Sequence, residues 1–361
     1  MSEPCAFPLI VFGVGHVGRA FLTQLAQTRP ALIARYEIDL RPIALVDSTG
    51  ALFDRDGFPP EAVDAVMRAK VNRQSIVEQR GSLAGIVALE LIKHAQSQGV
   101  EHAIVVDTTA ADGMEPALAR ALELGGAVVL ANKRPLAGPW AQAQVFFAST
   151  RTRFEATVGA GLPVVYTLRY LVDTGDTVRH IEGALSGTLG YLCTRLEEGE
   201  AFSMAVGTAK AKGYTEPDPR DDLSGMDVAR KALILARLAG WSMEPTDIRV
   251  EPLYPAEMAS LSVDEFMAEL PRLDSDFAAY MGALAGVPRY MAEISPDRGI
   301  VALRMVGERL AAQLRGTLNQ VSFTTQRYDE HPLTIIGPGA GLEVTGAAVL
   351  EDCLQVAQTM R

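Results

Sequence analysis

The chain has 361 residues, enough for two domains that each bury a full hydrophobic core. Its formal net charge is −11 and no segment is rich in Lys and Arg, which argues against nucleic acid as a partner. No apolar run approaches the ~20 residues of a membrane span, no signal peptide is visible, and Cys5, Cys193 and Cys353 form neither a zinc pattern nor a disulfide framework. We therefore expect a cytoplasmic protein with no membrane partner.

A dinucleotide-binding motif is predicted near the N-terminus. The apolar strand PLIVF is followed at once by the glycine-rich segment GVGHVG and then by a helical pattern. The first glycine permits a tight turn, the second lets the backbone approach a pyrophosphate, and the third lets the helix pack closely on the strand. The residues expected to bind a dinucleotide here are Gly13, Gly15, His16, Val17 and Gly18.

The second predicted strand, residues 42–46, ends in Asp47, which is placed to bind the adenosine ribose hydroxyls. The spacing is longer than usual because residues 29–40 are expected to include a loop. The alternative is that Asp47 caps a turn before Ser48. A carboxylate at this position would repel the 2′-phosphate of NADP, and no Arg lies within the next five residues. We therefore expect NAD(H) to be preferred and NADP(H) to be possible, with Arg55, Lys70 or Arg73 reaching the phosphate if the chain folds back.

Further strands follow in the rhythm of a doubly wound sheet. Residues 102–106 lead into Thr108 and Thr109, small polar residues suited to face a nicotinamide. After a predicted helix at 115–124, the strand at 126–130 delivers Lys133 at its carboxyl end, where such sheets bind their ligands. Lys133 is thus expected to reach the cofactor or substrate, unless it is an ordinary surface lysine.

The middle of the chain predicts a second domain. Residues 153–158 are predicted as a strand carrying Glu155, and the tight turn that follows has carbonyls that could coordinate a hard cation with it. An ion pair between Glu155 and an Arg is the alternative. A strand at 180–185 ends in small residues, among them Gly187 and Thr188, which would let a substrate carboxylate approach backbone N–H groups. The alternative for Thr188 is a position near a helix cap.

The segment GYTEPDPRDDLSGMDVARK, at residues 213–231, is the most informative. Its acidic loop, which includes Glu216 and Asp222, would hold an ammonium or hydroxyl group of a substrate. Ser224 and Asp227 form an S-x-x-D pattern that predicts an N-cap, and Lys231 follows Asp227 by one helical turn on a largely apolar helix. Lys231 is either a semi-buried ion-pair partner of Asp227 or a proton donor.

The C-terminal segment repeats the pattern of a strand, a glycine turn and a helix. A strand at 333–336 is followed by GPGAG and by a helix at 345–360, which suggests that the tail returns to the first domain. The predicted fold class is α/β. A Rossmann-type dinucleotide-binding domain at 1–150 is completed by 336–361, and an interlocked α+β domain at 151–335 serves catalysis and dimerisation.

Together these segments resemble the monofunctional homoserine dehydrogenases over nearly the whole chain. The segment at 213–231 is highly specific to that family, whereas the glycine fingerprint is not. The matching segments are GVGHVG at 13–18, ANK at 131–133, EATVGAGLP at 155–163, LSGTLGYL at 185–192, GYTEPDPRDDLSGMDVARK at 213–231 and GPGAG at 337–341.

The resemblance implies the reversible, NAD(P)H-dependent reduction of L-aspartate 4-semialdehyde to L-homoserine, on the route to threonine, methionine and isoleucine. It implies a homodimer and a monovalent cation, usually sodium. By resemblance, the catalytic residues are Lys231, Lys133 and Asp227. The substrate residues are Glu216, Asp222, Thr188, Gly187 and Tyr214, and Gly339 joins the cofactor residues. The cation ligands are Glu155 and the carbonyls of Val158, Ala160 and Leu162.

Several features of the family are not expected in this chain. The dinucleotide fold begins at residue 8, which leaves no room for a fused aspartokinase. About twenty residues follow the GPGAG turn, too few for a regulatory domain, so feedback inhibition by threonine is not expected in this polypeptide.

Two other functions fit the sequence less well. Aspartate semialdehyde dehydrogenase needs a cysteine nucleophile in a polar site, but Cys193 lies in an apolar helix and Cys5 precedes the first strand. A non-catalytic dinucleotide-sensing protein would need neither the two lysines nor the acidic loop.

Overall fold

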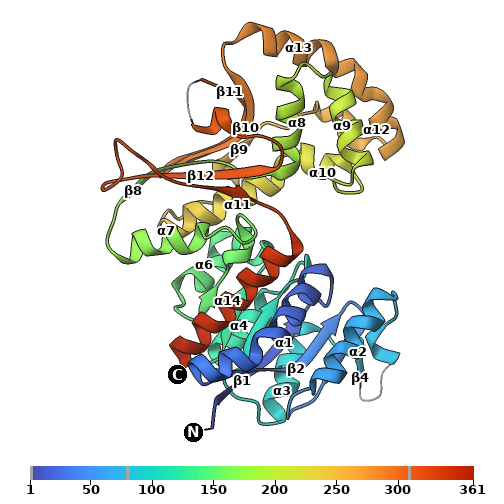
Figure 1. Cartoon of the computed structure of the whole chain (residues 1–361), viewed down its shortest axis with the longest axis vertical. Helices are drawn as coiled ribbons and strands as arrows, with labels where there is room; N and C mark the ends of the chain where they lie inside the picture. The colour runs from blue at the N-terminus through green and yellow to red at the C-terminus, as the bar shows by residue number, and fades with distance from the viewer. Residues whose placement is uncertain (1–2, 79–81, 308–309) are drawn as a thin grey trace. The chain divides into compact units, whose positions relative to one another are not determined.

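The computed structural model describes residues 3–78, 82–307 and 310–361. The chain forms two compact units. The first contains Met1–Gly161 together with Gly341–Arg361, and the second contains Leu162–Ala340 (Figure 1). The sequence placed these divisions at 150/151 and 335/336. Two sheets, each accompanied by helices, confirm the predicted α/β class.

The sheet of the first unit has seven strands in the order β4-β3-β2-β1-β5-β6-β7. β1 is parallel to both β2 and β5, and the parallel pairing continues through β6 to β7, whereas β3 and β4 are antiparallel. The core strands are apolar and buried on both faces, as a parallel sheet covered by helices requires. The strands are β1 (Cys5–Phe12), β2 (Ile38–Asp47), β3 (Gly50–Phe53), β4 (Ser82–Ala84), β5 (Ile104–Asp107), β6 (Ala127–Leu130) and β7 (Thr152–Arg153).

The C-terminal helix returns to the first unit, as predicted. α14 packs along α1, and a Cβ at Gly346 would lie 2.9 Å from the backbone nitrogen of Phe21, so a small residue is needed there. The Gln24 side chain also donates to the carbonyl of Glu343, 2.7 Å away. The helices of this unit are α1 (His16–Tyr36), α2 (Pro60–Val71), α3 (Ala88–Ser97), α4 (Glu115–Glu123), α5 (Arg134–Ala137), α6 (Trp140–Ala148) and α14 (Leu342–Met360), with short 3₁₀ turns η1 (Ile76–Glu78) and η2 (Glu155–Thr157).

The prediction of a loop within residues 29–40 is wrong. α1 continues through Pro30 to Tyr36 and ends where Glu37 takes a left-handed conformation, with φ of 53°. A proline inside a helix removes one hydrogen bond, but tertiary contacts hold this helix. Leu22 and Leu25 are buried, and Arg29 pairs with Asp39 at 2.6 Å.

The second unit is built on a six-stranded sheet in the order β13-β12-β8-β10-β11-β9, in which only β9 and β11 pair in parallel. Its strands are β8 (Val178–Ala184), β9 (Ile248–Val250), β10 (Val287–Ser295), β11 (Arg298–Val306), β12 (Leu318–Thr325) and β13 (Leu333–Pro338). Its helices are α7 (Val164–Asp173), α8 (Gly187–Glu197), α9 (Phe202–Ala211), α10 (Pro219–Leu223), α11 (Met226–Leu238), α12 (Val263–Glu269) and α13 (Asp274–Ala283), with short 3₁₀ turns η3 (Pro245–Asp247), η4 (Ala256–Ser260), η5 (Leu270–Leu273) and η6 (Leu310–Gln313).

Helix α11 is the most deeply buried helix of this unit. From Lys231 to Leu238 every residue is buried, because α11 packs against strands β9, β10 and β11 and against α7. A helix that is apolar on most sides requires such cover. Within the described residues, no helix is both long and apolar enough to cross a membrane.

Candidate active site

The three glycines of the N-terminal loop have different surroundings. Gly13 has a φ of +94°, and a Cβ there would lie 2.9 Å from Thr108 and Thr109. A Cβ at Gly18 would overlap the carbonyl oxygen of Gly13, so glycine is needed here for the helix to pack closely on the strand. Around Gly15 there is open space, because no heavy atom lies within 4 Å of its Cβ position. This pattern fits a loop whose backbone a pyrophosphate can approach.

The start of α1 is suited to bind an anion. Gly15 is its N-cap and offers no side-chain hydrogen bond to the first turn, so the first N–H groups of the helix lack a side-chain cap. Gly15 and His16 are exposed, and Val17 is half-buried. The Thr108 hydroxyl donates to Gly13 O at 2.7 Å, which ties the loop to the end of β5.

A buried polar network joins the ends of β5 and β6. Asp107, fully buried, accepts hydrogen bonds from the N–H of Thr109 at 2.9 Å and from the Asn132 amide at 3.0 Å. Burial raises the pKa of Asp107 despite these bonds. The sequence places Asp107 and Asn132 at strand ends but does not predict the hydrogen bond between them. Their bonds fix the backbone next to Lys133, which is half-buried at the N-cap of α5.

Asp47 has the turn-capping role that the sequence offered as its alternative, and it also pairs with a lysine. One carboxylate oxygen accepts from Thr49 N at 2.8 Å, as in a turn cap, and the other pairs with Lys70 at 2.6 Å. Burial alone would raise the pKa of Asp47, but the hydrogen bonds from Lys70 and Thr49 outweigh it and the pKa is lowered. Arg55, by contrast, lies beside Gly99. Lys70 is therefore the basic residue that the fold returns to Asp47.

In the second unit, the acidic segment folds against the start of α8. The Thr188 hydroxyl donates to Tyr214 O at 2.6 Å, and Glu216 N donates to Asp222 at 2.8 Å. Burial raises the pKa of Asp222, and the nearby carboxylates of Glu216 and Asp227 raise it further, against the hydrogen bonds from Glu216 N and Thr188. The structure thus brings together Gly187, Thr188, Tyr214, Glu216 and Asp222, and their role in binding substrate stays a prediction.

The predicted capping pattern of Ser224 and Asp227 is wrong. Ser224 is the C-cap of α10, and the N-cap of α11 is Gly225, with φ of 71°. A Cβ at Gly225 would overlap the hydroxyl of Tyr290, so the chain turns tightly here and only glycine fits. Ser224 still accepts a hydrogen bond from Met226 N, at 3.3 Å. The short acidic helix before the turn was not visible in the sequence pattern.

Lys231 lies at the centre of the arrangement in this unit. Its Nζ atom pairs with Asp227 at 2.8 Å and donates to Leu185 O at 2.7 Å. The Lys231 side chain is 11% exposed, whereas that of Asp227 is 45% exposed, so the pair opens toward solvent on the carboxylate side. Leu185 directly precedes Ser186 and Gly187. The ammonium group is therefore fixed beside the residues expected to bind substrate.

The start of α8 is shaped by close backbone contacts. Ser186, and not Thr188, is its N-cap, because the Ser186 hydroxyl accepts from Leu189 N at 3.2 Å. A Cβ at Gly187 would lie 3.3 Å from Thr317, which leaves little room for a side chain.

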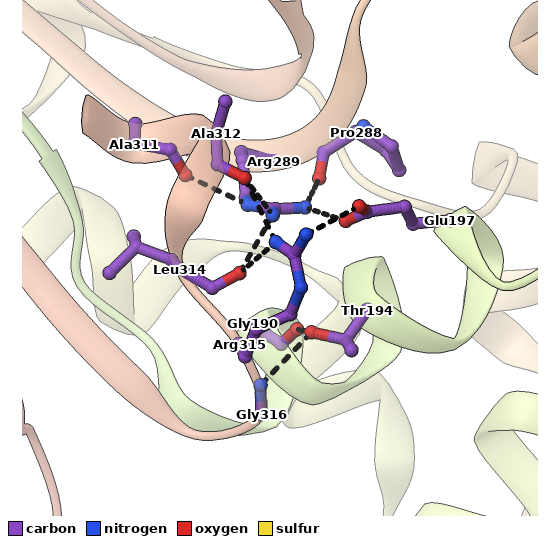
Figure 2. Close-up of polar contacts among 10 residues, drawn as sticks. All are labelled: Gly190, Thr194, Glu197, Pro288, Arg289, Ala311, Ala312, Leu314, Arg315 and Gly316. Atoms are coloured by element: carbon purple, nitrogen blue, oxygen red, sulfur yellow. Dashed lines mark hydrogen bonds and ion pairs between the residues drawn. The ribbon is translucent and has the colours of Figure 1, made fainter. Parts of the chain in front are cut away.

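The far end of α8 is held by a buried arginine. Arg289 is 2% exposed and donates to Glu197 at 2.9 Å, while Arg315 pairs with the other oxygen of Glu197 at 3.0 Å. Figure 2 shows the Arg289 guanidinium among carbonyl oxygens, most of them from the segment that precedes Gly316. The N–H of Gly316 donates to the Thr194 hydroxyl at 3.1 Å. These interactions fix α8 along its length. The accepting carbonyls are those of Pro288, Ala311, Ala312 and Leu314.

Glu155, the carboxylate of the expected cation site, lies in a 3₁₀ turn and not on a strand, because β7 ends at Arg153, and Val158, Ala160 and Leu162 follow that turn. Glu155 is 8% exposed in η2, and its N–H donates to Asp352 at 2.8 Å. Gly159 and Ala160 both take positive φ, 84° and 57°, so the backbone reverses there. The described residues contain no group of three or more His, Cys, Asp and Glu side chains that could hold a metal ion. A site with one carboxylate and several carbonyls remains chemically suited to a hard cation.

The cysteines do not offer a nucleophile. Burial raises the pKa of Cys193 to about 12 and also raises that of Cys353. Cys5 is exposed at the start of β1, the end of that strand opposite its ligand-binding carboxyl end. Thioester chemistry requires an accessible thiolate in a polar site.

Comparisons with known proteins agree with this geometry. The family model described as homoserine dehydrogenase matches residues 163–354, more than half of the chain. A homoserine dehydrogenase of Emericella nidulans is 37% identical over 390 residues and each chain is covered to 100%. The chloroplastic bifunctional aspartokinase/homoserine dehydrogenase 2 of Zea mays is 38% identical over 360 residues, with 96% of this chain covered. The chain spans only 38% of the length of that relative.

Solved structures share the fold. A crystal structure of a Candida auris protein of unknown function has a TM-score of 0.85 at 32% identity and covers 98% of this chain and 99% of its own. A hyperthermophilic archaeal homoserine dehydrogenase in complex with NADPH has a TM-score of 0.75 at 20% identity, with 98% of each chain covered. With the family model and the full-length relative in agreement, this chain belongs to the homoserine dehydrogenase family.

Proposed function

We propose that this chain is a homoserine dehydrogenase, which reduces L-aspartate 4-semialdehyde to L-homoserine with a nicotinamide dinucleotide and also catalyses the reverse reaction. The observation that carries the proposal is the Lys231–Asp227 pair. It lies on a buried helix, bonded to Leu185 O, next to a segment rich in carboxylates. This is the arrangement that a positioned proton donor beside a cationic substrate requires.

Lys231 is assigned proton transfer. The dinucleotide, when bound, supplies the hydride. As the aldehyde carbon is reduced, its oxygen develops negative charge, and the Lys231 ammonium stabilises that charge and gives up a proton. Asp227 and Leu185 O fix the direction of the Nζ atom. In the reverse reaction Lys231 accepts the proton, so homoserine oxidation should be favoured at alkaline pH.

The remaining substrate groups are assigned by charge. Glu216 and Asp222 bind the α-ammonium group, because both offer carboxylates in the acidic segment. Backbone N–H groups near Gly187 and Thr188 bind the α-carboxylate, with Tyr214 beside them. Lys133 is also assigned to catalysis by resemblance, as a source of positive charge.

The first unit is proposed to bind the dinucleotide. Its pyrophosphate would rest on the open backbone at Gly15 and the start of α1. Thr108 and Thr109 would face the nicotinamide. Gly339, which belongs to the second unit, is assigned to the cofactor by resemblance. The archaeal structure with NADPH supports a dinucleotide cofactor in this fold. A monovalent cation, sodium by resemblance, is assigned to Glu155 and the carbonyls of Val158, Ala160 and Leu162.

A homodimer is proposed from the same family resemblance. The helix α7 carries two exposed tyrosines one turn apart, Tyr166 at 54% and Tyr170 at 53% exposure. Aromatic side chains of this kind are enriched at interfaces between proteins.

The function is tested by following NAD(P)H formation at 340 nm. The purified chain should reduce the dinucleotide only when L-homoserine is added. Omission of homoserine and replacement by L-serine are the controls. Binding of the dinucleotide without homoserine-dependent turnover would instead support the dinucleotide-sensing alternative, and the dehydrogenase proposal would fail.

For the cofactor we propose a preference for NAD(H), with NADP(H) tolerated because of Lys70. The Asp47 carboxylate repels a 2′-phosphate. Lys70, whose Nζ atom lies 2.6 Å from that carboxylate, supplies a compensating charge. Lys70→Ala should lower kcat/KM for NADP more than for NAD, by about tenfold in the ratio, since one lost charge-assisted hydrogen bond has roughly that effect. Arg55→Ala is the matched control. An unchanged ratio in Lys70→Ala would remove Lys70 from cofactor selection.

A further inference from the structure

A cavity of about 490 Å³ lies between helices α1 and α2 and strand β2 of the first unit. This volume is typical of sites that bind small molecules. Its walls are formed mostly by apolar side chains, and its rim is exposed to solvent at Ala26 and Pro60. A ligand could therefore enter it and bury apolar surface there. The apolar residues that line it include Leu22, Leu25, Ile33, Phe58 and Val63.

The cavity is separate from the residues assigned to the dinucleotide. Pro60 lines it at the start of α2, and Lys70, ten residues later on the same helix, pairs with Asp47. A helix rises about 1.5 Å per residue, so about 15 Å of helix lies between Pro60 and Lys70. On α1, Leu22 is seven residues from the N-cap Gly15, which corresponds to about 10 Å. A ligand of this cavity would thus be distinct from the proposed cofactor.

One positive charge is in excess at the wall of this cavity. Among the described residues that line it, only Arg29 is charged. The Nε atom of Arg29 donates to Asp39 at 2.6 Å, and the Nε atom of Arg41 donates to the other oxygen of the same carboxylate, also at 2.6 Å. Burial would raise the pKa of Asp39, but the hydrogen bonds from the two guanidinium groups outweigh it and lower the pKa, so the carboxylate stays ionised. Two arginines therefore share one negative charge.

We propose that the cavity binds a monocarboxylate with an apolar tail, of the class of the medium-chain fatty acids. The tail packs between Ile33 and Phe58, and the carboxylate accepts hydrogen bonds from Arg29. A guanidinium group has five N–H donors, and Arg29 gives two of them to Asp39. An α-amino acid fits less well, because its ammonium group would find no carboxylate among the described lining residues. The proposal does not depend on the dehydrogenase function.

Isothermal titration calorimetry of the full chain tests the proposal with octanoate, 1-octanol and octylammonium, which share one tail and differ in charge. Octanoate should bind once per chain, with a Kd about tenfold below that of octanol, because its carboxylate gains a charge-assisted hydrogen bond. Octylammonium should bind more weakly than octanol, since Arg29 repels it. Absence of saturable octanoate binding, or equal affinity for octanoate and octylammonium, would overturn the proposal.

Ala26→Phe tests where octanoate binds. The added ring would fill the rim of the cavity, so the Kd for octanoate should rise at least about tenfold. Ala31→Phe is the matched control, because Ala31 is also exposed on α1 and is not among the described residues that line the cavity. It should bind octanoate like the native chain. Equal weakening in both variants, or none in either, would overturn the assignment to this cavity.

A second copy of the chain is the other occupant that an apolar surface could have. In that case Ala26→Phe would change the mass measured by sedimentation velocity and octanoate would not bind the native chain, and this result would overturn the proposal. Arg29→Gln should bind octanoate no more tightly than octanol, and a folded variant that keeps the native preference for octanoate would overturn it as well. The comparison of the three head groups uses only the native chain, so the proposal can still fail if a variant does not fold.

Discussion

Lys231 satisfies the requirements of a charged group on a buried helix. An ammonium group that leaves water needs a counter-charge and hydrogen-bond acceptors. Asp227 and the carbonyl of Leu185 supply them at 2.8 and 2.7 Å. The sequence left two interpretations open, an ion pair or a proton donor. The ion pair is present in the structure, and the same pair would also orient a proton donor. The catalytic role therefore stays a prediction.

Asp222 leads to a prediction on pH and stability. Its pKa is raised by burial above the usual value of 3.8, so the folded protein takes up a proton at this site more readily than the unfolded chain. Stability from this group therefore falls as pH rises from the unfolded pKa through the folded one. Asp222→Asn should have an equal or higher melting temperature at pH 7, an advantage that disappears near pH 4. KM for homoserine should rise.

The measurements are melting curves at both pH values and homoserine kinetics. Asp221→Asn, an exposed neighbour, is the control. A melting temperature that falls at pH 7 in Asp222→Asn would show that the carboxylate stabilises the fold, against this account.

Contacts between residues that are close together in the chain could be predicted from the sequence. Contacts between residues that are distant in the chain could not. Lys231 and Asp227 were found because they are one helical turn apart. The bond between Asp107 and Asn132 was not predicted, because the two residues meet only through the parallel pairing of β5 and β6. Lys70 was named only as a distant candidate, since its approach to Asp47 depends on the path of α2.

Among the elements, strands and helices with clear apolar patterns were predicted well, and their ends less well. β12 and the short helix α10 have no pattern that distinguishes them locally. A loop was expected within residues 29–40, but α1 continues through Pro30 because the burial of Leu22 and Leu25 and the Arg29–Asp39 pair hold it together. Glu155 was placed on a strand, but the chain turns into η2 right after Arg153.

The turn after η2 carries the prediction about the cation. Left-handed Gly159 and Ala160 reverse the backbone beside Glu155, which lets carbonyls converge with one carboxylate. Replacing sodium and potassium with tetramethylammonium should lower either the activity or the melting temperature. Glu155→Gln should show a smaller dependence on the cation than the wild type. Equal activity and melting temperature in both buffers would remove the cation site from this account.

At the scale of the whole molecule, the glycine turn before the last helix led to the prediction that the C-terminal segment returns to the first domain. Residues Gly341–Arg361 belong to the first unit, although 179 residues of the second unit, Leu162–Ala340, separate them from Gly161. The parallel strand order of the first unit follows from alternating strands and helices. The mixed order of the second sheet could not be derived, because antiparallel pairing between distant strands leaves no local signal.

Lys231 is proposed to perform proton transfer in a homoserine dehydrogenase. The most direct measurement is kcat for homoserine oxidation in Lys231→Ala, compared with wild type and with Lys93→Ala, which removes an exposed lysine. In Lys231→Ala, kcat should fall about 10²–10⁴-fold, with NADH binding and the fold intact. Lys231→Met, which preserves the packing, should fall equally. A folded Lys231→Ala variant that keeps more than about a tenth of wild-type kcat would contradict the claim, since a positioned acid–base group contributes far more than that.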